Sequence, residues 1–225
     1  MQQPPRCVGI ILDGNRRWAK ERELPTLEGH RQGAKNTDTI ALAARDLGIE
    51  HVALYAFSTE NWKRRSEEVS YLMELFEEAI RDRFSRLTNE GIRVRFVGQL
   101  DRFSEKLQRL MCDVEAKSPA APRMTLWVCL SYGGQAEIVA AARALVGAGE
   151  DITEASLAAH LWTADMPDPD LIIRTSGEHR LSNFLLWKSA YSELFFPDVY
   201  WPAFTKADLE KILEEYAGRE RRLGK

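Results

Sequence analysis

Two apolar runs separated by a helical segment constrain the fold of this chain more than any other feature of its sequence. The runs Cys7–Leu12 and His51–Phe57 are almost continuously apolar, which is typical of strands that are covered on both faces of a sheet. Between them, apolar residues recur at helical spacing from about His30 to Leu47. A strand, a helix and a second strand in this order predict parallel strands joined by a right-handed crossover.

The alternation of strands and helices continues along the chain. Further strands are predicted at Ile92–Val97, Met124–Leu130 and Leu171–Ile173, with a last apolar stretch at Leu194–Phe196. Helices are predicted at Ser66–Leu87, Phe103–Lys117, Tyr132–Val146, Thr153–Leu161 and Asn183–Tyr191, and a terminal helix follows the capping residue Thr205. No repeat or linker divides the sequence, so residues 1–225 are predicted to form one α/β domain, with a mostly parallel central sheet flanked by helices on both faces.

Charge and composition exclude several classes of protein. A formal charge of −3 and a pI near 5.9 argue against a nucleic-acid binder, which carries a basic stripe, so any cationic site is local. The sequence has no apolar run long enough to span a membrane and no apolar core of a secretory signal near its N-terminus, so we expect a cytoplasmic protein. Cys7, Cys112 and Cys129 fit neither a disulfide framework nor a metal knuckle and are expected to be core thiols.

Polar segments follow three of the predicted strands. They are Asp13–Trp18, Ser58–Arg64 and Arg174–Ser182. Ligands of an open parallel sheet bind at the carboxyl ends of its strands. We therefore expect the three segments to converge on one site.

The residues of these segments are suited to a phosphorylated ligand. The guanidinium groups of Arg16, Arg17, Arg64, Arg174 and Arg180 offer planar donor pairs that match phosphate oxygens. Gly14, Gly29 and Gly177 allow backbone amides to approach an anion closely. Asp13 is the lone carboxylate of the first segment, and beside a polyphosphate it would share a magnesium ion, which prefers oxygen ligands.

The sequence lacks the motifs of several common phosphate-binding and hydrolytic enzymes. Neither the nucleotide-binding pattern G-x-x-x-x-G-K-[ST] nor G-x-G-x-x-G occurs, and neither does the zinc motif H-E-x-x-H nor the serine elbow G-x-S-x-G. Aromatic side chains accompany the charges, namely Trp18, Phe57, Trp62, Tyr132 and Trp187. They either pack in the core or surround an apolar tail or a carbocation. Two anion-binding segments beside an apolar slot suit a prenyl diphosphate.

Four longer motifs, in order along the chain, carry a resemblance to a known family. They are Val8–Trp18, Tyr55–Trp62, Tyr132–Gly134 and Asp170–Trp187. With these motifs the sequence closely resembles the cis-prenyltransferases, typified by undecaprenyl diphosphate synthase. The resemblance implies a homodimeric α/β fold with an apolar tunnel beside the sheet, two diphosphate sites and Mg²⁺. The implied reaction transfers an allylic group from dimethylallyl, geranyl or farnesyl diphosphate to a C5 diphosphate, normally isopentenyl diphosphate, and a long product would bring contact with a membrane surface.

The resemblance also implies roles for residues at matching positions. Asp13 would hold Mg²⁺ and assist departure of the allylic diphosphate, while a cradle for that group is formed by Gly14, Asn15, Arg16 and Arg17. Residues that support this site and the proton-transfer step are His30, Ser58, Asn61, Trp62 and Arg64. The second diphosphate would be held by Arg174, Arg180 and Ser182. Glu193 and His179 match positions that complete the metal environment, and Arg222-Leu-Gly224 resembles a terminal element that reaches the partner's site.

Thr26 departs from the family pattern. The family typically has an arginine there, aimed at the allylic diphosphate, and loss of a charge-assisted hydrogen bond costs about 1.5–3 kcal/mol. Arg16, where many bacterial members have glycine, is expected to compensate, since Arg-Arg also occurs in the family. The product length stays open, because Ala56 is small while Tyr71, Phe76, Phe84 and Trp127 are each large enough to block a tunnel.

Three other functions stay open beside a regular cis-prenyl synthase. On the same scaffold, the enzyme would make a short product or an irregular, branched product of the lavandulyl type by head-to-middle coupling. A second alternative is a non-catalytic partner subunit of a synthase. Such subunits tend to lose the aspartate of the first segment and the arginines, which are present here. A generic phosphosugar or nucleotide binder is disfavoured by the missing motifs.

Overall fold

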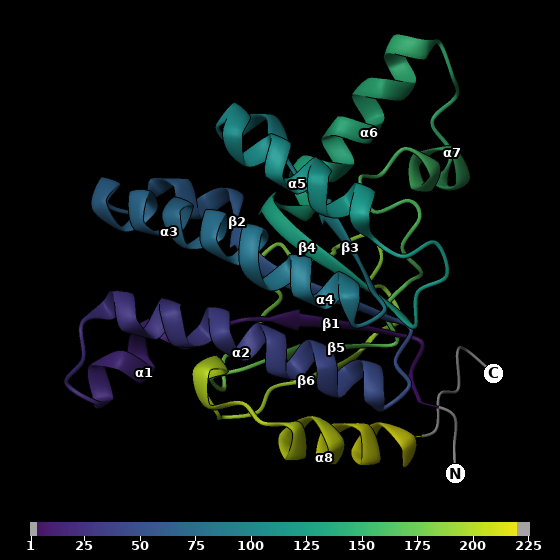
Figure 1. Ribbon diagram of the computed structural model, residues 1–225. Helices are drawn as coiled ribbons and strands as arrows, with labels where there is room; N and C mark the ends of the chain where they lie inside the picture. The colour runs from purple at the N-terminus through teal and green to yellow at the C-terminus, as the bar shows by residue number, and fades with distance from the viewer. Residues whose placement is uncertain (1–3, 220–225) are drawn as a thin grey trace.

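The computed structural model describes residues 4–219, which fold around a six-stranded sheet (Figure 1). The strand order is β3-β4-β2-β1-β5-β6, and every neighbouring pair is parallel. The strands are β1 (Cys7–Ile11), β2 (His51–Ser58), β3 (Ile92–Val97), β4 (Met124–Tyr132), β5 (Leu171–Arg174) and β6 (Glu193–Phe195). The parallel α/β sheet predicted from the alternating pattern is thus confirmed.

One face of the sheet carries the main hydrophobic core. Strand side chains alternate between the faces, so Val8 and Ile10 of β1 enter this core while Cys7 and Ile11 enter a cluster on the other face. The helices that contribute to the main core are α2 (Thr26–Asp46), α3 (Ser66–Glu78), α4 (Ser85–Asn89), α5 (Glu105–Lys117) and α8 (Lys206–Ala217). Their apolar stripes follow the helical spacing of the sequence.

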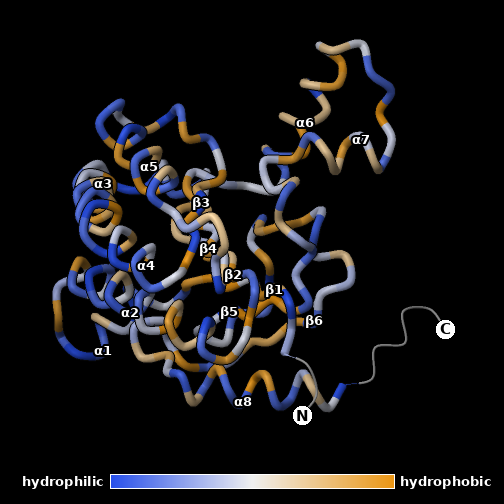
Figure 2. The backbone as a smooth tube through the Cα atoms, turned by 45° about the vertical axis from the view of Figure 1, so that its right-hand side comes forward, coloured by the Kyte–Doolittle hydropathy of each residue, from blue (hydrophilic) through white to orange (hydrophobic). Residues whose placement is uncertain are grey.

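The second face is covered largely by irregular chain. Met166, Phe184 and Leu185 pack there against β1, β4 and β5. The packing is close, because a Cβ on Gly9 would lie 2.5 Å from Cδ1 of Ile172. Helices α6 (Gly134–Ala148) and α7 (Glu154–Ala159) pack on each other and on Trp187, and they stand away from the rest of the molecule in Figures 1 and 2.

Several local predictions were wrong. No helix forms at Asn183–Tyr191, where Ser182, Asn183 and Leu185 have positive φ angles of 47°, 68° and 44°, which a helix does not accept. The long helix from Ser66 is interrupted by a π-helical turn, η2 (Ala79–Phe84). A short helix, α1 (Asn15–Glu21), forms where only a charged loop was expected. Cys112 is exposed, whereas Cys7 and Cys129 are buried as predicted.

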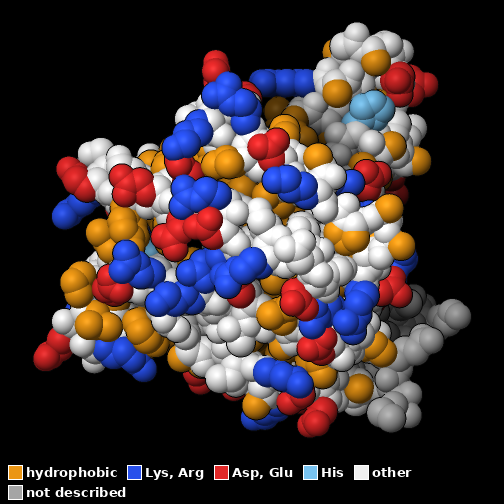
Figure 3. All heavy atoms as spheres, viewed as in Figure 1, with side chains coloured by type: hydrophobic (Ala, Val, Ile, Leu, Met, Phe, Trp, Pro, Cys, Tyr) orange, Lys and Arg blue, Asp and Glu red, His pale blue; other side chains and the backbone are white. Residues whose placement is uncertain are grey.

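Two features of the described residues bear on the excluded classes of protein. None of their helices combines the length and apolar character needed to cross a membrane. On the face drawn in Figure 3, Lys and Arg side chains are interspersed with Asp and Glu.

Candidate active site at the carboxyl edge of the sheet

The three polar segments converge at the carboxyl edge of the sheet, as predicted. They form two adjoining pockets of about 680 and 580 Å³, volumes within the range of small-molecule sites. Both pockets are lined by Asp13, Asn15, His30 and Arg64. The first pocket extends along α1 to Thr26, and the second extends to the loop after β5.

Asp13 and Arg174 join β1 to β5 at the centre of the site. Oδ2 of Asp13 accepts hydrogen bonds from Nη2 of Arg174 at 2.7 Å and from Nε at 3.2 Å. The Arg174 side chain is 5% exposed, and its Nη1 donates to Oγ of Ser182 at 2.6 Å. Burial on its own raises the pKa of the Asp13 carboxyl, but the hydrogen bonds and charge of Arg174, together with Arg17, leave that pKa below its usual range. Asp13 is therefore ionised at neutral pH.

Glu178 links the basic residues of the two pockets. It pairs with Arg17 at 2.8 Å and also with Arg180. Arg17 additionally lies 3.3 Å from Oδ1 of Asp13 and donates to Oγ of Ser176 at 2.7 Å. These side chains form one charged network that connects Arg17 of the first pocket to Arg180 of the second.

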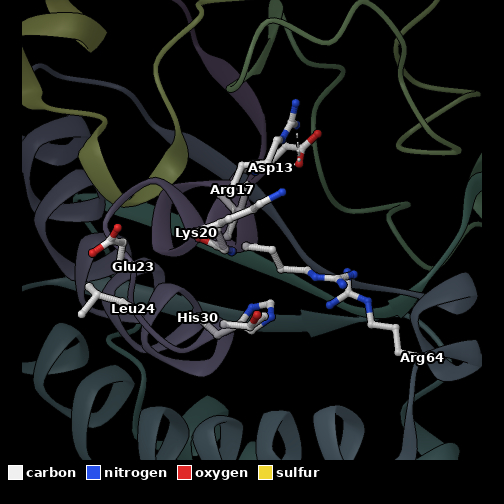
Figure 4. A pocket seen from close by; sticks show the side chains of 12 residues that line it. Asp13, Arg17, Lys20, Glu23, Leu24, His30 and Arg64 are labelled. Carbon is white, nitrogen blue, oxygen red and sulfur yellow. Dashed lines mark hydrogen bonds and ion pairs between the residues drawn. The ribbon is translucent and has the colours of Figure 1, made fainter.

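Close packing of α1 on α2 fixes the first pocket. Gly14 has a φ of 101°, and a Cβ on it would lie 2.5 Å from the ring of Tyr200. A Cβ on Gly29 would lie 2.0 Å from the carbonyl oxygen of Asn15, so only glycine allows this approach. Figure 4 shows Arg17 beside Asp13 at one end of the pocket and Glu23 at the other end. Lys20 lies between this pair and Glu23.

His30 faces Arg64 across the pocket (Figure 4). Glu68 contacts both side chains. Oε1 of Glu68 lies 3.1 Å from Nε2 of His30 and 3.2 Å from Nη1 of Arg64. Burial and the charge of Arg64 lower the pKa of His30 below its usual value, although Glu68 opposes them. His30 is therefore neutral at pH 7. Its Nε2 donates to Oε1 of Glu68, so Nδ1 is the acceptor.

An apolar cavity opens beside the two pockets. It has a volume of about 70 Å³ and lies between α2, α3 and the strands β2 and β4. It shares Leu12, Asn15 and His30 with both pockets. Its wall includes Ala56, Phe76 and Phe84, whereas Trp127 belongs to the core on the other face of the sheet.

Comparisons with known proteins agree on one family. Residues 11–224 match the family model described as "Putative undecaprenyl diphosphate synthase". An isoprenyl transferase of Thermotoga maritima is 46% identical over 98% of this chain and 97% of that protein. A ditrans,polycis-undecaprenyl-diphosphate synthase of Pseudomonas aeruginosa, specific for (2E,6E)-farnesyl diphosphate, is 45% identical over 98% and 91% of the two chains.

The chain belongs to the undecaprenyl diphosphate synthase family of prenyltransferases. Solved structures of the same fold include lavandulyl diphosphate synthase from Lavandula x intermedia in complex with dimethylallyl diphosphate, with a TM-score of 0.94, 37% identity and 99% coverage of both chains. A probable undecaprenyl diphosphate synthase from Campylobacter jejuni has a TM-score of 0.85 and 29% identity over the full length of both chains. The sequence-based assignment to the cis-type prenyl diphosphate synthases is thereby confirmed.

Other residues assigned to the site from the sequence lie around the two pockets of this prenyltransferase. Thr26 and Arg16 line the first pocket, and the second is lined by Ser58, Asn61, Arg180 and Ser182. Oδ1 of Asn61 accepts from the backbone amide of Ser58 at 3.1 Å, which fixes the turn after β2.

Three aromatic residues assigned to the substrate have packing contacts instead of lining a pocket. Phe57 is 1% exposed and packs in the main core. Trp62 packs edge-to-face against Phe57 and at a tilt against Phe103, and it donates to Oγ of Ser131 at 2.9 Å. Arg22 lies over the ring of Trp18.

The predicted metal ligands do not come together within one chain. Glu193 pairs with Leu171 at the start of β5, whereas Asp13 contacts Arg174 at the end of that strand, three residues farther along. Glu193 binds Arg219, and the ring of His179 stacks on Phe196. Residues 4–219 contain no group of three or more potential His, Cys, Asp or Glu ligands. Arg222-Leu-Gly224 lies outside the described residues.

Sequence reasoning missed Glu68 and Glu178 as site residues. Glu68 was included only in the predicted helix Ser66–Leu87, and Glu178 only in the polar segment Arg174–Ser182 and its motif. Glu68 follows Arg64 by four residues, but Arg64 is extended and precedes α3, so helical spacing gave no signal for their contact. Glu178 had no local signal, because its partner Arg17 is distant in the sequence.

Proposed function

We propose that this chain joins an allylic prenyl diphosphate to a C5 diphosphate, normally isopentenyl diphosphate, and releases diphosphate. The observation that carries the proposal is that two cationic pockets adjoin at Asp13 and His30 and meet one apolar cavity at His30. Two diphosphates and one hydrocarbon tail require this combination of surfaces. The allylic substrate comes from the series dimethylallyl, geranyl and farnesyl diphosphate.

The first pocket holds the allylic diphosphate in this proposal. Arg16, Arg17 and Lys20 line it and supply donors for phosphate oxygens. When the allylic C–O bond breaks, the electron pair leaves with the diphosphate, and fixed cations stabilise the charge that develops. The prenyl tail follows the path from His30 into the apolar cavity.

The second pocket holds the acceptor diphosphate through Arg174, Arg180 and Ser182. The double bond of the acceptor forms the new C–C bond at the allylic carbon, and loss of a proton from the acceptor restores an olefin. His30 borders both pockets, and its Nδ1 carries no proton because the ring proton is on Nε2, facing Glu68. We therefore assign Nδ1 of His30 to accept the proton that the acceptor loses.

Asp13 suits a magnesium ion that arrives with its substrate. Mg²⁺ is commonly held by one or two carboxylates plus substrate phosphates and water, and Asp13 offers one ionised carboxylate at the junction of the pockets. When bound, Mg²⁺ would neutralise the leaving diphosphate. The participation of Glu193 and His179 rests on the resemblance alone.

The proposal is tested with the purified chain, MgCl₂ and each allylic diphosphate, with and without labelled isopentenyl diphosphate. We expect a product longer than the allylic substrate by one or more C5 units in mass spectrometry, and loss of turnover with EDTA. Absence of product from every pair would refute the proposal. Turnover that needs a second protein would instead identify a non-catalytic partner subunit.

Irregular coupling is a second candidate reaction. The similarity to the lavandulyl diphosphate synthase, with a TM-score of 0.94, favours it, as does Thr26 at the wall of the first pocket. In that case the acceptor is a second dimethylallyl diphosphate. A branched product from dimethylallyl diphosphate alone would distinguish this reaction from the regular one.

The family resemblance also supports a homodimer. Helix α6 exposes the apolar residues Val139 and Val146, which are 49% and 69% exposed. They line a shallow hollow with Ala142 and Arg143 on a helix that stands away from the body of the molecule (Figure 2). Light scattering of the wild type and of a Val146→Asp variant tests this assembly, and a monomeric wild type would refute it.

A further inference from the structure

The apolar cavity has a mouth and a floor. Its mouth lies where it meets the two cationic pockets, at Leu12, Asn15 and His30. Away from the mouth, the cavity is lined along α2 as far as Thr37. On the opposite side it is lined from Leu72 of α3 to Arg83 of η2. Arg83 is therefore the charged residue of the cavity wall that lies farthest from the mouth.

An ion pair joins the two helices at this floor. Nη1 of Arg83 lies 3.0 Å from Oδ2 of Asp38, the residue after Thr37 on α2. The two side chains are only 14% and 20% exposed. Nη2 of Arg86 is 3.7 Å from the same Asp38 oxygen, and Glu78 is 3.7 Å from Arg83.

The pair is incompletely satisfied, which is unusual for buried charges. Nε of Arg83 and Oδ1 of Asp38 are both buried without a hydrogen-bond partner among the described residues. Arg83 belongs to the π-helical turn η2, and π turns occur frequently at functional sites. A buried pair of this kind contributes little to stability, so its polar surface at the end of an apolar cavity needs another explanation.

We propose that the Arg83–Asp38 ion pair forms the floor of the prenyl cavity and stops elongation of the product. The inference rests on the proposed prenyl transfer. A hydrocarbon chain that reaches Arg83 meets a charged pair that it cannot solvate. Further elongation would separate the pair or expel it into solvent.

The depth of the cavity sets the expected product. Helical rise places Thr37 about 10 Å from His30 and Arg83 about 16 Å from Leu72. Four chain carbons joined by bonds of about 1.5 Å span about 4–5 Å, so about two to three isoprenoid units reach the floor. We therefore expect products of about C10 to C15.

The decisive variant replaces both charges by apolar side chains, Asp38→Leu with Arg83→Met. Apolar replacement of a buried pair is commonly tolerated. We expect the product distribution to shift upward by one or more C5 units in mass spectrometry of the labelled products. The charge-swapped variant, Asp38→Arg with Arg83→Asp, restores a polar floor and is expected to return the wild-type length.

Arg81→Met is the matched control. Arg81 lies in the same π turn, is exposed and pairs with Asp82, and it does not line the cavity. We expect the wild-type product length from it. If the apolar double variant does not fold, Arg83→Ala replaces it, because Asp38 then keeps Arg86 as a partner.

Three results would overturn the inference. An unchanged product length in the folded apolar variants would show that the pair is not the floor, and so would a wild-type product well beyond C15. An equally lengthened product from the Arg81→Met variant would show that the π turn η2, rather than the Arg83–Asp38 pair, sets the product length. Absence of any prenyl diphosphate from the wild type is distinct, because it refutes the proposed function and this inference with it.

Discussion

Replacing Asp13 by Asn separates the catalytic role of this residue from its structural role. The amide has almost the same shape as the carboxylate and keeps an oxygen that accepts from Arg174. It removes the negative charge that now receives two hydrogen bonds from Arg174 and lies 3.3 Å from Arg17. Arg174 keeps its bond to Ser182, so the site does not collapse.

The structural and the catalytic effects of the Asp13→Asn substitution differ in size. A charge-assisted hydrogen bond contributes about 1–2 kcal/mol more than a neutral one, and this is reduced because the Asp13 side chain is 27% exposed. For a chain of this size we expect the Tm to fall by about 2–6 °C. Loss of a fixed electrostatic contact in the transition state costs about 2.7–4 kcal/mol, which lowers kcat about 10²–10³-fold.

The assay is incorporation of labelled isopentenyl diphosphate at saturating allylic diphosphate, with Tm measured on the same preparations. Glu28→Gln is the control, because Glu28 is an acidic residue on α2 that pairs with Arg31 and lies outside both pockets. We expect it to match the wild type within about twofold. An Asp13→Asn enzyme within about tenfold of the wild-type kcat would refute the catalytic role.

Three further predictions concern buried polar groups around the site. Glu68→Gln should lower kcat about tenfold with little change in Tm, because the neutral amide no longer fixes the proton on Nε2 of His30 or balances the charge of Arg64; an unchanged kcat would contradict this. Because the pKa of His30 is depressed in the folded state, the unfolded chain binds a proton below about pH 6.5 that the folded chain does not. The free energy of unfolding should therefore fall between pH 7.5 and 5 more steeply in the wild type than in a His30→Gln variant. Equal pH dependence of the two proteins in urea titrations would contradict this prediction. Tyr132→Phe removes a hydroxyl that donates to Glu137, a carboxylate only 1% exposed, and should lower the free energy of unfolding by about 1–3 kcal/mol; a loss well below this range would show that Glu137 does not depend on Tyr132.

The comparisons leave the product length open, and the cavity is the feature that decides it. A relative at 45% identity is a farnesyl-specific undecaprenyl diphosphate synthase, while a structural neighbour at 37% identity is a lavandulyl diphosphate synthase. In this chain Ala56, Phe76 and Phe84 line the apolar cavity, and the Arg83–Asp38 pair is its proposed floor.

The sequence by itself determined the strands, most of the helices and the edge of the sheet where the site lies. These features are local or follow from parallel topology: apolar periodicity identifies the elements, and the carboxyl ends of parallel strands share one edge. Asp13 and the arginines were found for that reason. The resemblance then added His30 and Thr26, which now line the first pocket.

Only the tertiary structure decided which charges meet. Asp13 and Arg174 are 161 positions apart, Glu178 and Arg17 equally so, and no local pattern records such pairs. The irregular segment after Ser182 was mistaken for a helix, because positive φ angles are imposed by its packing on the sheet rather than by its residue types. The floor of the cavity is likewise tertiary, because Arg83 and Asp38 meet only when α2 packs beside η2.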